Sequence, residues 1–251
     1  MTRTDTQAAG NSGGQSRSNP GGQAGAIAGL LVVDKPLGLS SMDVVRRVRR
    51  AAGGAKTGHA GTLDPLATGV LVCCLGRATR WVDRIMALGK IYEATVDLSA
   101  FTTTDDREGP RQEVAVATPP DQACVRAALD GLVGAIQQKP PAYSAVHIDG
   151  QRAYQLARRG QDVPTTARTV RVDAIELLDY AWPNARIRVA CGKGTYIRSL
   201  ARDLGARLGT GGHLASLRRL AVGPFDLAAA VPICRLDQPL TQADLVVPAG
   251  W

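Results

Sequence analysis

The chain has 251 residues, of which 45% are hydrophobic, so it is long enough to bury a substantial core in one or two domains. Lys and Arg outnumber Asp and Glu by 30 to 22, which gives a net charge of +8 and favours polyanionic partners such as nucleic acid or an anionic membrane surface. The longest apolar run, AIAGLLVV before Asp34, is far shorter than the roughly 18 residues of a membrane-spanning helix, and no signal-peptide cleavage pattern is present.

The spacing of cysteine and histidine argues against two common frameworks. These residues are Cys73, Cys74, Cys124, Cys191, Cys234, His59, His147 and His213. They form no CxxC and no HxxxH pair, so neither a disulfide framework nor a zinc site is indicated. Free thiols fit a reducing compartment. We therefore expect a cytoplasmic protein that holds no metal.

The N-terminal segment differs in composition from the rest of the chain. Residues 1–25 are rich in Gly, Ser, Gln and Asn and contain almost nothing to bury, which predicts a disordered tail. No repeat and no second linker divides the remaining residues. We expect one folded domain over residues 26–236, followed by a C-terminal extension over residues 237–251.

The first predicted elements are a strand and a helix. LLVVDKP predicts a strand that ends at Pro36. SSMDVVRRVRRAAGG predicts a helix that begins after Ser40, with Asp43 completing a capping box and two glycines at its end. The residues expected on its apolar face are Val45, Val48 and Ala52. Its arginines are compatible with phosphate contacts and equally with a solvated helix face.

Further along the chain, strand patterns outnumber helical ones. Residues 91–98, 167–180 and 185–192 are rich in β-branched residues and nearly alternate in polarity, as half-buried antiparallel strands do. Helices are predicted over residues 152–160 and 195–209. No βαβ rhythm and no GxGxxG motif is found. We therefore expect an α+β fold, with a mixed, mostly antiparallel sheet flanked by helices.

A glycine-rich loop, GHAGTLDPLATG, carries an isolated acid, Asp64. The following Pro65 disfavours helical geometry, so the aspartate should be extended with a fixed side-chain direction. Gly58, Gly61 and Gly69 allow close approach of backbone. The loop is thus suited to presenting one carboxylate. The alternative is that Asp64 only caps its own turn.

Six segments in register carry a family resemblance. They are VDKPLGLSS, GHAGTLDPLATGVLVCCLGRATR, KIYEATVDL, PPAYSAVHIDGQRAYQLARRG, CGKGTYIRSLARDLG and HLASLRRLAVGPF, between about Gly29 and Phe225. In order and spacing they resemble the TruB-type tRNA pseudouridine-55 synthases. The resemblance implies a pseudouridine synthase fold, isomerisation of uridine 55 in the tRNA T loop, and no cofactor. The tRNA T stem-loop would be the partner, and we expect a monomer.

The resemblance also implies the catalytic residues. Asp64 matches the catalytic aspartate, Tyr92 the tyrosine that stacks on the target base and helps to move the C5 proton, and Arg198 the arginine that pairs with the aspartate. A glycosidase would need two carboxylates, whereas one suffices if the detached uracil is retained and water is excluded. The carboxylate could attack the sugar or remove a proton from it. The resemblance favours proton removal at C2′.

Four further residues match substrate-binding positions of the family: His59, Tyr196, Leu217 and Lys35. His59 matches a histidine that enters the T loop, and Tyr196 matches a tyrosine that contacts the nucleotide. Leu217 and Lys35 match positions that line the pocket. Extrusion of the base costs a few kcal/mol, which stacking on Tyr92 would partly offset.

RNA affinity should come from phosphate contacts, for which the candidate arginines are Arg152, Arg158, Arg159, Arg202, Arg218 and Arg219. The chain departs from the family pattern at Ser99 and Thr103, while Asp106 is retained and could join the Arg198 network. We expect no complete C-terminal PUA domain, which many bacterial members carry, within residues 237–251.

Two other functions are compatible with parts of the sequence. A non-catalytic RNA-binding or tRNA-folding protein would explain the charge, but it would have no use for Asp64, Tyr92 and Arg198 together. A nucleoside hydrolase would release the base, but the aspartate-rich metal-binding cluster expected of one is missing from the sequence.

Overall fold

The computed structural model describes residues 27–143, 147–148, 151–152 and 166–247. Its strands are β1 (Gly29–Lys35), β2 (Thr57–His59), β3 (Ala67–Leu75), β4 (Lys90–Asp97), β5 (Ala100–Thr102), β6 (Arg111–Glu113), β7 (Gly134–Gln138), β8 (His147–Ile148), β9 (Gln151–Arg152), β10 (Arg168–Ala181), β11 (Asn184–Cys191), β12 (His213–Val222), β13 (Phe225–Asp226) and β14 (Val231–Pro232). Its helices are α1 (Ser41–Ala51), α2 (Val82–Ala87), α3 (Gln122–Asp130) and α5 (Ile197–Leu208), with short 3-10 helices η1 (Gly76–Trp81), η2 (Ile233–Asp237) and η3 (Gln242–Asp244).

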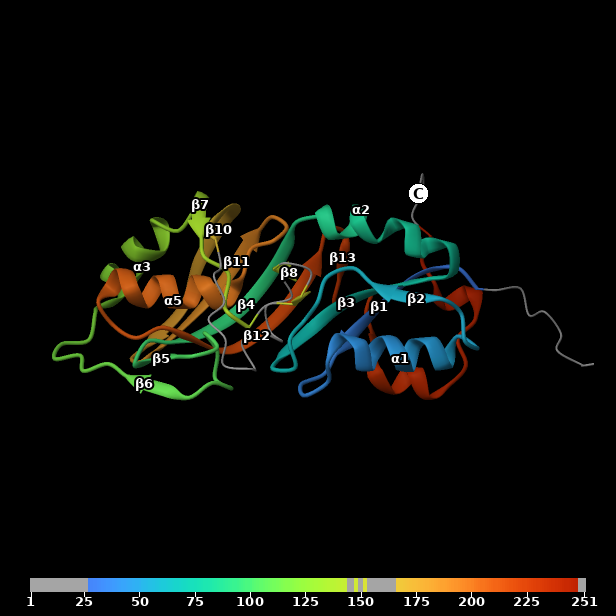
Figure 1. The fold of residues 1–251 in the computed structure, drawn as a ribbon, viewed down its shortest axis with the longest axis horizontal. Coiled ribbons are helices and arrows are strands. Elements are labelled where there is room, and N and C mark those ends of the chain that lie inside the picture. The colour runs from blue at the N-terminus through green and yellow to red at the C-terminus, as the bar shows by residue number, and fades with distance from the viewer. Residues whose placement is uncertain (1–26, 144–146, 149–150, 153–165, 248–251) are drawn as a thin grey trace, which may run out of the picture.

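One large sheet organises the described part of the chain. Its order is β14-β1-β3-β12-β4-β11-β10-β7, with β2 on β3 and β13 on β12. The pairs β1–β14 and β3–β12 are parallel, and the other pairs in this sheet are antiparallel. Figure 1 shows α3 and α5 toward one end of the molecule and α1 and α2 toward the other. The predicted α+β fold with a mixed, mostly antiparallel sheet is confirmed.

The position of β12 in the sheet matters most for the site. Although β12 follows β11 and α5 in the chain, it inserts between β3 and β4, at the middle of the sheet. Its register sets Leu217 opposite Ala94, and Arg219 opposite both Tyr92 and Gly69. Residues from the end of the chain thus lie beside the segments that carry Asp64 and Tyr92.

Helix α1 has the ends that the sequence predicts. The Ser40 side chain accepts a hydrogen bond from the Asp43 amide, and the Asp43 carboxylate accepts one from the Ser40 amide. Val44, Val45 and Val48 are buried on the sheet, while Ala52 is partly buried. The capping box confirms the predicted start, and the apolar face includes one more valine than the pattern indicated.

The other predicted elements are also present where the structure describes them. Residues 91–98 correspond to β4, residues 167–180 to β10 and residues 185–192 to β11. The helix predicted over residues 195–209 is α5. The helix predicted over residues 152–160 lies almost entirely outside the described residues, as does the N-terminal tail.

The sheet is buried on both faces around β1. Leu31 and Val33 join the core that contains α1, α3 and α5, whereas Leu30 and Val32 pack with η1 and α2. Successive side chains of β1 therefore pack into two apolar layers, one on each face of the sheet. Continuous apolar strands such as β1 and β3 follow from this arrangement.

The described part of the C-terminal segment packs on the same core. Leu240 and Leu245 are buried in the layer that contains α1 and α5. The Leu30 amide donates to the Val246 carbonyl at 2.8 Å, and the Val246 amide donates to the Leu30 carbonyl at 2.8 Å. Residues 237–247 are thus attached to the sheet. Of the helices that the structure describes, none has the length and apolar character needed to cross a membrane.

Candidate active site

The Asp64 loop is held on one side by Ser41, the first residue of α1, and on the other by Gly38, which precedes that helix. The Ser41 hydroxyl donates to the Leu63 carbonyl at 2.9 Å and accepts from the Leu63 amide at 2.8 Å. On the other side, the Gly38 amide donates to the Pro65 carbonyl at 2.9 Å. Asp64 itself accepts the Ala67 amide on its carbonyl at 3.0 Å. The backbone of the aspartate is therefore fixed by its flanking residues, which leaves its side chain for another role.

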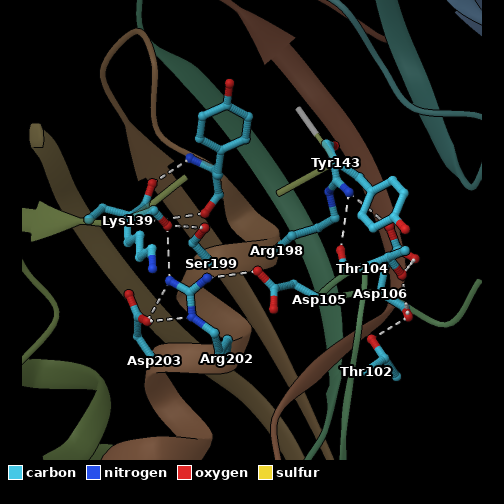
Figure 2. A network of polar contacts seen from close by, with 12 residues as sticks. Thr102, Thr104, Asp105, Asp106, Lys139, Tyr143, Arg198, Ser199, Arg202 and Asp203 are labelled. Atoms are coloured by element: carbon cyan, nitrogen blue, oxygen red, sulfur yellow. Dashed lines mark hydrogen bonds and ion pairs between the residues drawn. The ribbon is translucent and has the colours of Figure 1, made fainter. Parts of the chain in front are cut away.

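Arg198 is the partner of that side chain. An Arg198 guanidinium nitrogen lies 3.0 Å from Asp64 Oδ2, and another lies 3.1 Å from Asp106 Oδ2. The guanidinium also donates to the carbonyls of Thr104 and Tyr143, at 3.1 and 2.9 Å (Figure 2). The Arg198 side chain is 8% exposed and that of Asp64 is 38% exposed. One buried cation thus fixes the direction of a carboxylate that stays accessible.

The loop that carries Asp106 is fastened to α5 twice. Arg202, one turn after Arg198, binds Asp105 at 2.7 Å and Asp203 at 2.9 Å, and Figure 2 shows these contacts beside those of Arg198. Asp106 in turn accepts the Thr104 hydroxyl at 2.6 Å. Burial raises the pKa of Asp105, while the nearby Arg202 charge opposes that rise. Arg202 therefore serves the structure of this loop, although the sequence left it as a candidate for phosphate binding.

Asp64 opens into a cavity of about 660 Å³, a volume typical of small-molecule sites. Its lining includes Asp64, Tyr92, Arg198, Tyr196, Leu217 and Arg219. Burial raises the pKa of the Tyr92 phenol, while the nearby Arg219 charge opposes that rise. Tyr92 thus presents a neutral ring and hydroxyl at neutral pH. Five of the residues named from the sequence therefore surround one space, namely Asp64, Tyr92, Arg198, Tyr196 and Leu217.

Tyr196 is held by two residues that the sequence analysis did not identify. Gln138, which is buried, accepts the Tyr196 amide at 2.8 Å and donates to the Tyr196 carbonyl at 3.1 Å. Arg168 lies over the Tyr196 ring, 5.1 Å from its centroid, and donates to the Gly194 carbonyl at 2.7 Å. Both residues come from strands β7 and β10, so no local motif pointed to them.

Lys35 and His59 lie next to the cavity but are not among its lining residues. Lys35 is fully buried, and its ammonium donates to the carbonyls of Leu39 at 2.6 Å and Pro36 at 3.1 Å. Burial lowers its pKa to about 8, while the charge of Asp64 opposes this effect. Burial also lowers the pKa of His59, which therefore favours a neutral imidazole.

The structure corrects the expectation that Arg219 contacts phosphate. Arg219 is 1% exposed and donates to the carbonyls of Val70 at 2.7 Å and Gly61 at 3.0 Å. Arg218 is on the other side of the strand and binds Asp34 at 2.8 Å. Arg158 and Arg159 lie outside the described residues. Within the described ranges, no group of three or more His, Cys, Asp or Glu residues could hold a metal ion.

Comparison with known proteins gives consistent matches across the chain. Residues 49–197 match the TruB family pseudouridylate synthase N-terminal domain, and residues 198–244 match the tRNA pseudouridylate synthase B C-terminal domain. A tRNA pseudouridine synthase B of Corynebacterium efficiens is 50% identical over 214 residues, which cover 84% of this chain and 72% of that protein. One from Thermobifida fusca is 49% identical over 85% of this chain and 75% of that protein.

Solved structures show the same architecture. A Cbf5-Nop10-Gar1 complex contains a chain that is 31% identical, with a TM-score of 0.65, over 83% of this chain and 54% of that one. The archaeal box H/ACA sRNP Nop10-Cbf5 complex gives 31% identity and a TM-score of 0.61 over 83% and 52%. This chain thus spans about half the length of those chains. The fold and the matches to tRNA pseudouridine synthase B define an isomerase of the pseudouridine synthase class. The chain belongs to the TruB family of pseudouridylate synthases.

Proposed function

We propose that this protein converts uridine 55 in the T loop of tRNA into pseudouridine, with Asp64 as the catalytic carboxylate. The observation that carries the proposal is the Asp64–Arg198 ion pair at 3.0 Å, on the wall of a cavity that Tyr92 also lines. The names of the relatives support tRNA as the substrate. The net charge of +8 supports a polyanionic partner.

The proposed reaction keeps every atom of the base. Asp64 removes the C2′ proton as the N1–C1′ bond breaks. The electron pair of the N1–C1′ bond stays on the uracil ring. After the ring rotates, Asp64 returns the proton to C2′ and C5 bonds to C1′. The C5 proton then leaves and N1 takes one up. The reaction therefore needs neither a net oxidation nor a second carboxylate, provided that the cavity retains the base.

Access to Asp64 requires that the target uridine leaves the T loop. Base extrusion costs a few kcal/mol, and stacking on an aromatic ring returns about 1–3 kcal/mol. Tyr92 lies on the cavity wall with Asp64 and Arg198, and is a suitable stacking partner. Tyr196, whose backbone Gln138 clamps, is a second aromatic surface for the nucleotide.

The test is tritium release from a tRNA transcript that carries 5-tritiated uridine. We expect the wild-type protein to release tritium from a transcript with uridine 55 and not from one with cytidine at that position. Asp64→Asn should bind tRNA with unchanged affinity and lose activity at least 1,000-fold, roughly the loss seen on removal of a group essential to the chemical step. A matched control is Asp173→Asn, which removes a carboxylate that pairs with Arg171 at the surface.

Three outcomes would overturn the proposal. An active Asp64→Asn variant would show that another group performs the chemistry. Free uracil among the products would indicate a nucleoside hydrolase, and tRNA binding without any conversion would indicate a non-catalytic RNA-binding protein. A T stem-loop fragment measured in parallel tests local recognition, because equal rates on the fragment and the full tRNA would place the contacts within the T arm.

A further inference from the structure

Arg219 is a buried cation on the face of the sheet that forms the floor of the cavity. Its register partner on β4 is Tyr92, and Leu217 lies two residues earlier on the same strand, so all three side chains share one face. All three also line the cavity. The Arg219 guanidinium is held in place because it donates to the Val70 carbonyl at 2.7 Å and to the Gly61 carbonyl at 3.0 Å. Gly61 is close to Asp64 in the catalytic loop.

This cation has no carboxylate partner within the residues that the structure describes. Its guanidinium donates to two backbone carbonyls and also forms a side-chain hydrogen bond with Tyr92, whereas Arg198 on the same cavity wall binds two carboxylates. Among the described residues, two further buried cations, Lys35 and Lys90, also donate to backbone carbonyls and form no ion pair. Among the described residues that line the cavity, the cations are Lys90, Arg168, Lys193, Arg198 and Arg219 and the carboxylates are Asp64 and Asp83, which gives a net formal charge of +3.

The neighbouring groups respond to the Arg219 charge. Burial is the main cause that lowers the pKa of Lys90 and His59, and the Arg219 charge adds to it in both cases. A buried charge without a counter-ion costs several kcal/mol of stability. A buried cation without a counter-ion is expected at a functional site, where it can stabilise an anion that forms during the reaction.

We propose that the fixed buried charge of Arg219, on the floor of the cavity, stabilises the uracil anion that forms when the N1–C1′ bond breaks. This inference rests on the proposed function. The electron pair of the broken bond stays on the ring and spreads over N1, O2 and O4, so one negative charge appears in the cavity. The guanidinium is fixed there by two carbonyls before the reaction begins, and little reorganisation is needed. C5 then bonds to C1′, the C5 proton leaves and N1 takes up a proton. The ring is neutral again at the end of these steps.

The leaving ability of the base provides the test. Fluorine at C5 withdraws electrons and stabilises the uracil anion, so an enzyme needs less help from a cation. Arg219→Gln should slow single-turnover consumption of the target uridine by about 100-fold, as loss of one preorganised donor does. With 5-fluorouridine at the same position, the loss should shrink to about tenfold or less. Arg219→Lys, which keeps the charge, should recover part of the activity on uridine.

Leu217→Ala is the matched control, because it changes an uncharged side chain two residues away on the same cavity face. It should slow both substrates by the same factor. If Arg219→Gln also slows both substrates equally, or slows neither, the proposal is wrong and Arg219 only supports the Asp64 loop. Circular dichroism and tRNA affinity are measured for each variant, because a general folding defect would change both.

A second measurement uses the unaltered protein and so does not depend on folding of a variant. The free barbiturate anion is a uracil-like ring that is negatively charged at neutral pH. The wild-type protein should bind it more tightly than neutral uracil, as measured by NMR titration without RNA. Equal or weaker binding of the anion would refute the role of Arg219. Failure of the proposed function can be distinguished from failure of the Arg219 proposal. If the proposed function is wrong, no pseudouridine forms with any tRNA or variant, the wild type included.

Discussion

Replacement of Asp106 by Asn tests the buried network that holds Arg198. The Asp106 side chain is 3% exposed and contacts Arg198 at 3.1 Å. It also accepts the Thr104 hydroxyl at 2.6 Å and the Glu108 amide at 3.0 Å through Oδ1. An asparagine keeps this Oδ1 acceptor. It replaces Oδ2, however, with an NH2 group that faces the Arg198 donor, so two donors oppose each other.

The size of the effect can be worked out from these contacts. Removal of one partner from a buried ion pair costs about 3–5 kcal/mol when the remaining charge is left without compensation. Arg198 retains Asp64 as a second carboxylate at 3.0 Å, so the lower end of that range applies. We expect Asp106→Asn to lower the free energy of unfolding by about 3 kcal/mol. Because Arg198 then loses one of its anchors, turnover should fall while tRNA affinity stays the same.

Urea unfolding at pH 7, followed by tryptophan fluorescence, measures this change. Asp173→Asn is the control, since the Arg171–Asp173 pair is exposed and should contribute at most about 0.5 kcal/mol. A loss below about 1 kcal/mol for Asp106→Asn would refute the reasoning, because it would mean that the pair with Arg198 is not energetically coupled to the fold. An unchanged turnover rate of Asp106→Asn would show that Asp106 is not needed to position Arg198.

Two other substitutions test burial and close backbone approach. Lys35 has its pKa lowered by burial from 10.5 to about 8, so between these values the folded protein holds one proton fewer than the unfolded chain and its stability rises with pH. Relative to Lys35→Met, the wild type should therefore gain about 3 kcal/mol from pH 7 to pH 11, measured by urea unfolding, and parallel curves would contradict the assigned burial. Gly69 has φ +99° and a Cβ there would lie 2.1 Å from the Arg219 carbonyl oxygen. Gly69→Ala should thus destabilise the protein by about 3 kcal/mol or more, and a melting temperature within a degree or so of the wild type would show that β3 and β12 can move apart.

Local sequence patterns predicted much of the fold because they encode interactions between near neighbours. The Ser40–Asp43 capping box started α1 as expected, since both hydrogen bonds lie within one turn of helix. Alternation over residues 185–192 indicated β11 for a similar reason, because successive side chains of a strand face opposite sides. Neither pattern could predict that β12 inserts between β3 and β4, since strand order depends on contacts between distant segments.

The candidate site was partly visible in the sequence. The glycine-rich loop indicated that Asp64 is presented, and the family resemblance suggested Arg198 as its partner, which the 3.0 Å ion pair matches. The part played by Arg219 was missed, although the alternation of β12 would have placed it on the face of Leu217. Arg168 gave no local signal, because only packing brings it over Tyr196.

The sequence by itself determined strands β1, β4, β10 and β11, helices α1 and α5, the α+β class and the family, because capping, alternation and contiguous motifs are properties of adjacent residues. Only the tertiary structure decided the charges of the site. It placed Arg198 between Asp64 and Asp106, and it buried Lys35 and Arg219 without carboxylate partners among the described residues. The physical reason is that desolvation and ion pairing depend on which atoms surround a group in space, and those atoms come from strands and helices far apart in the chain.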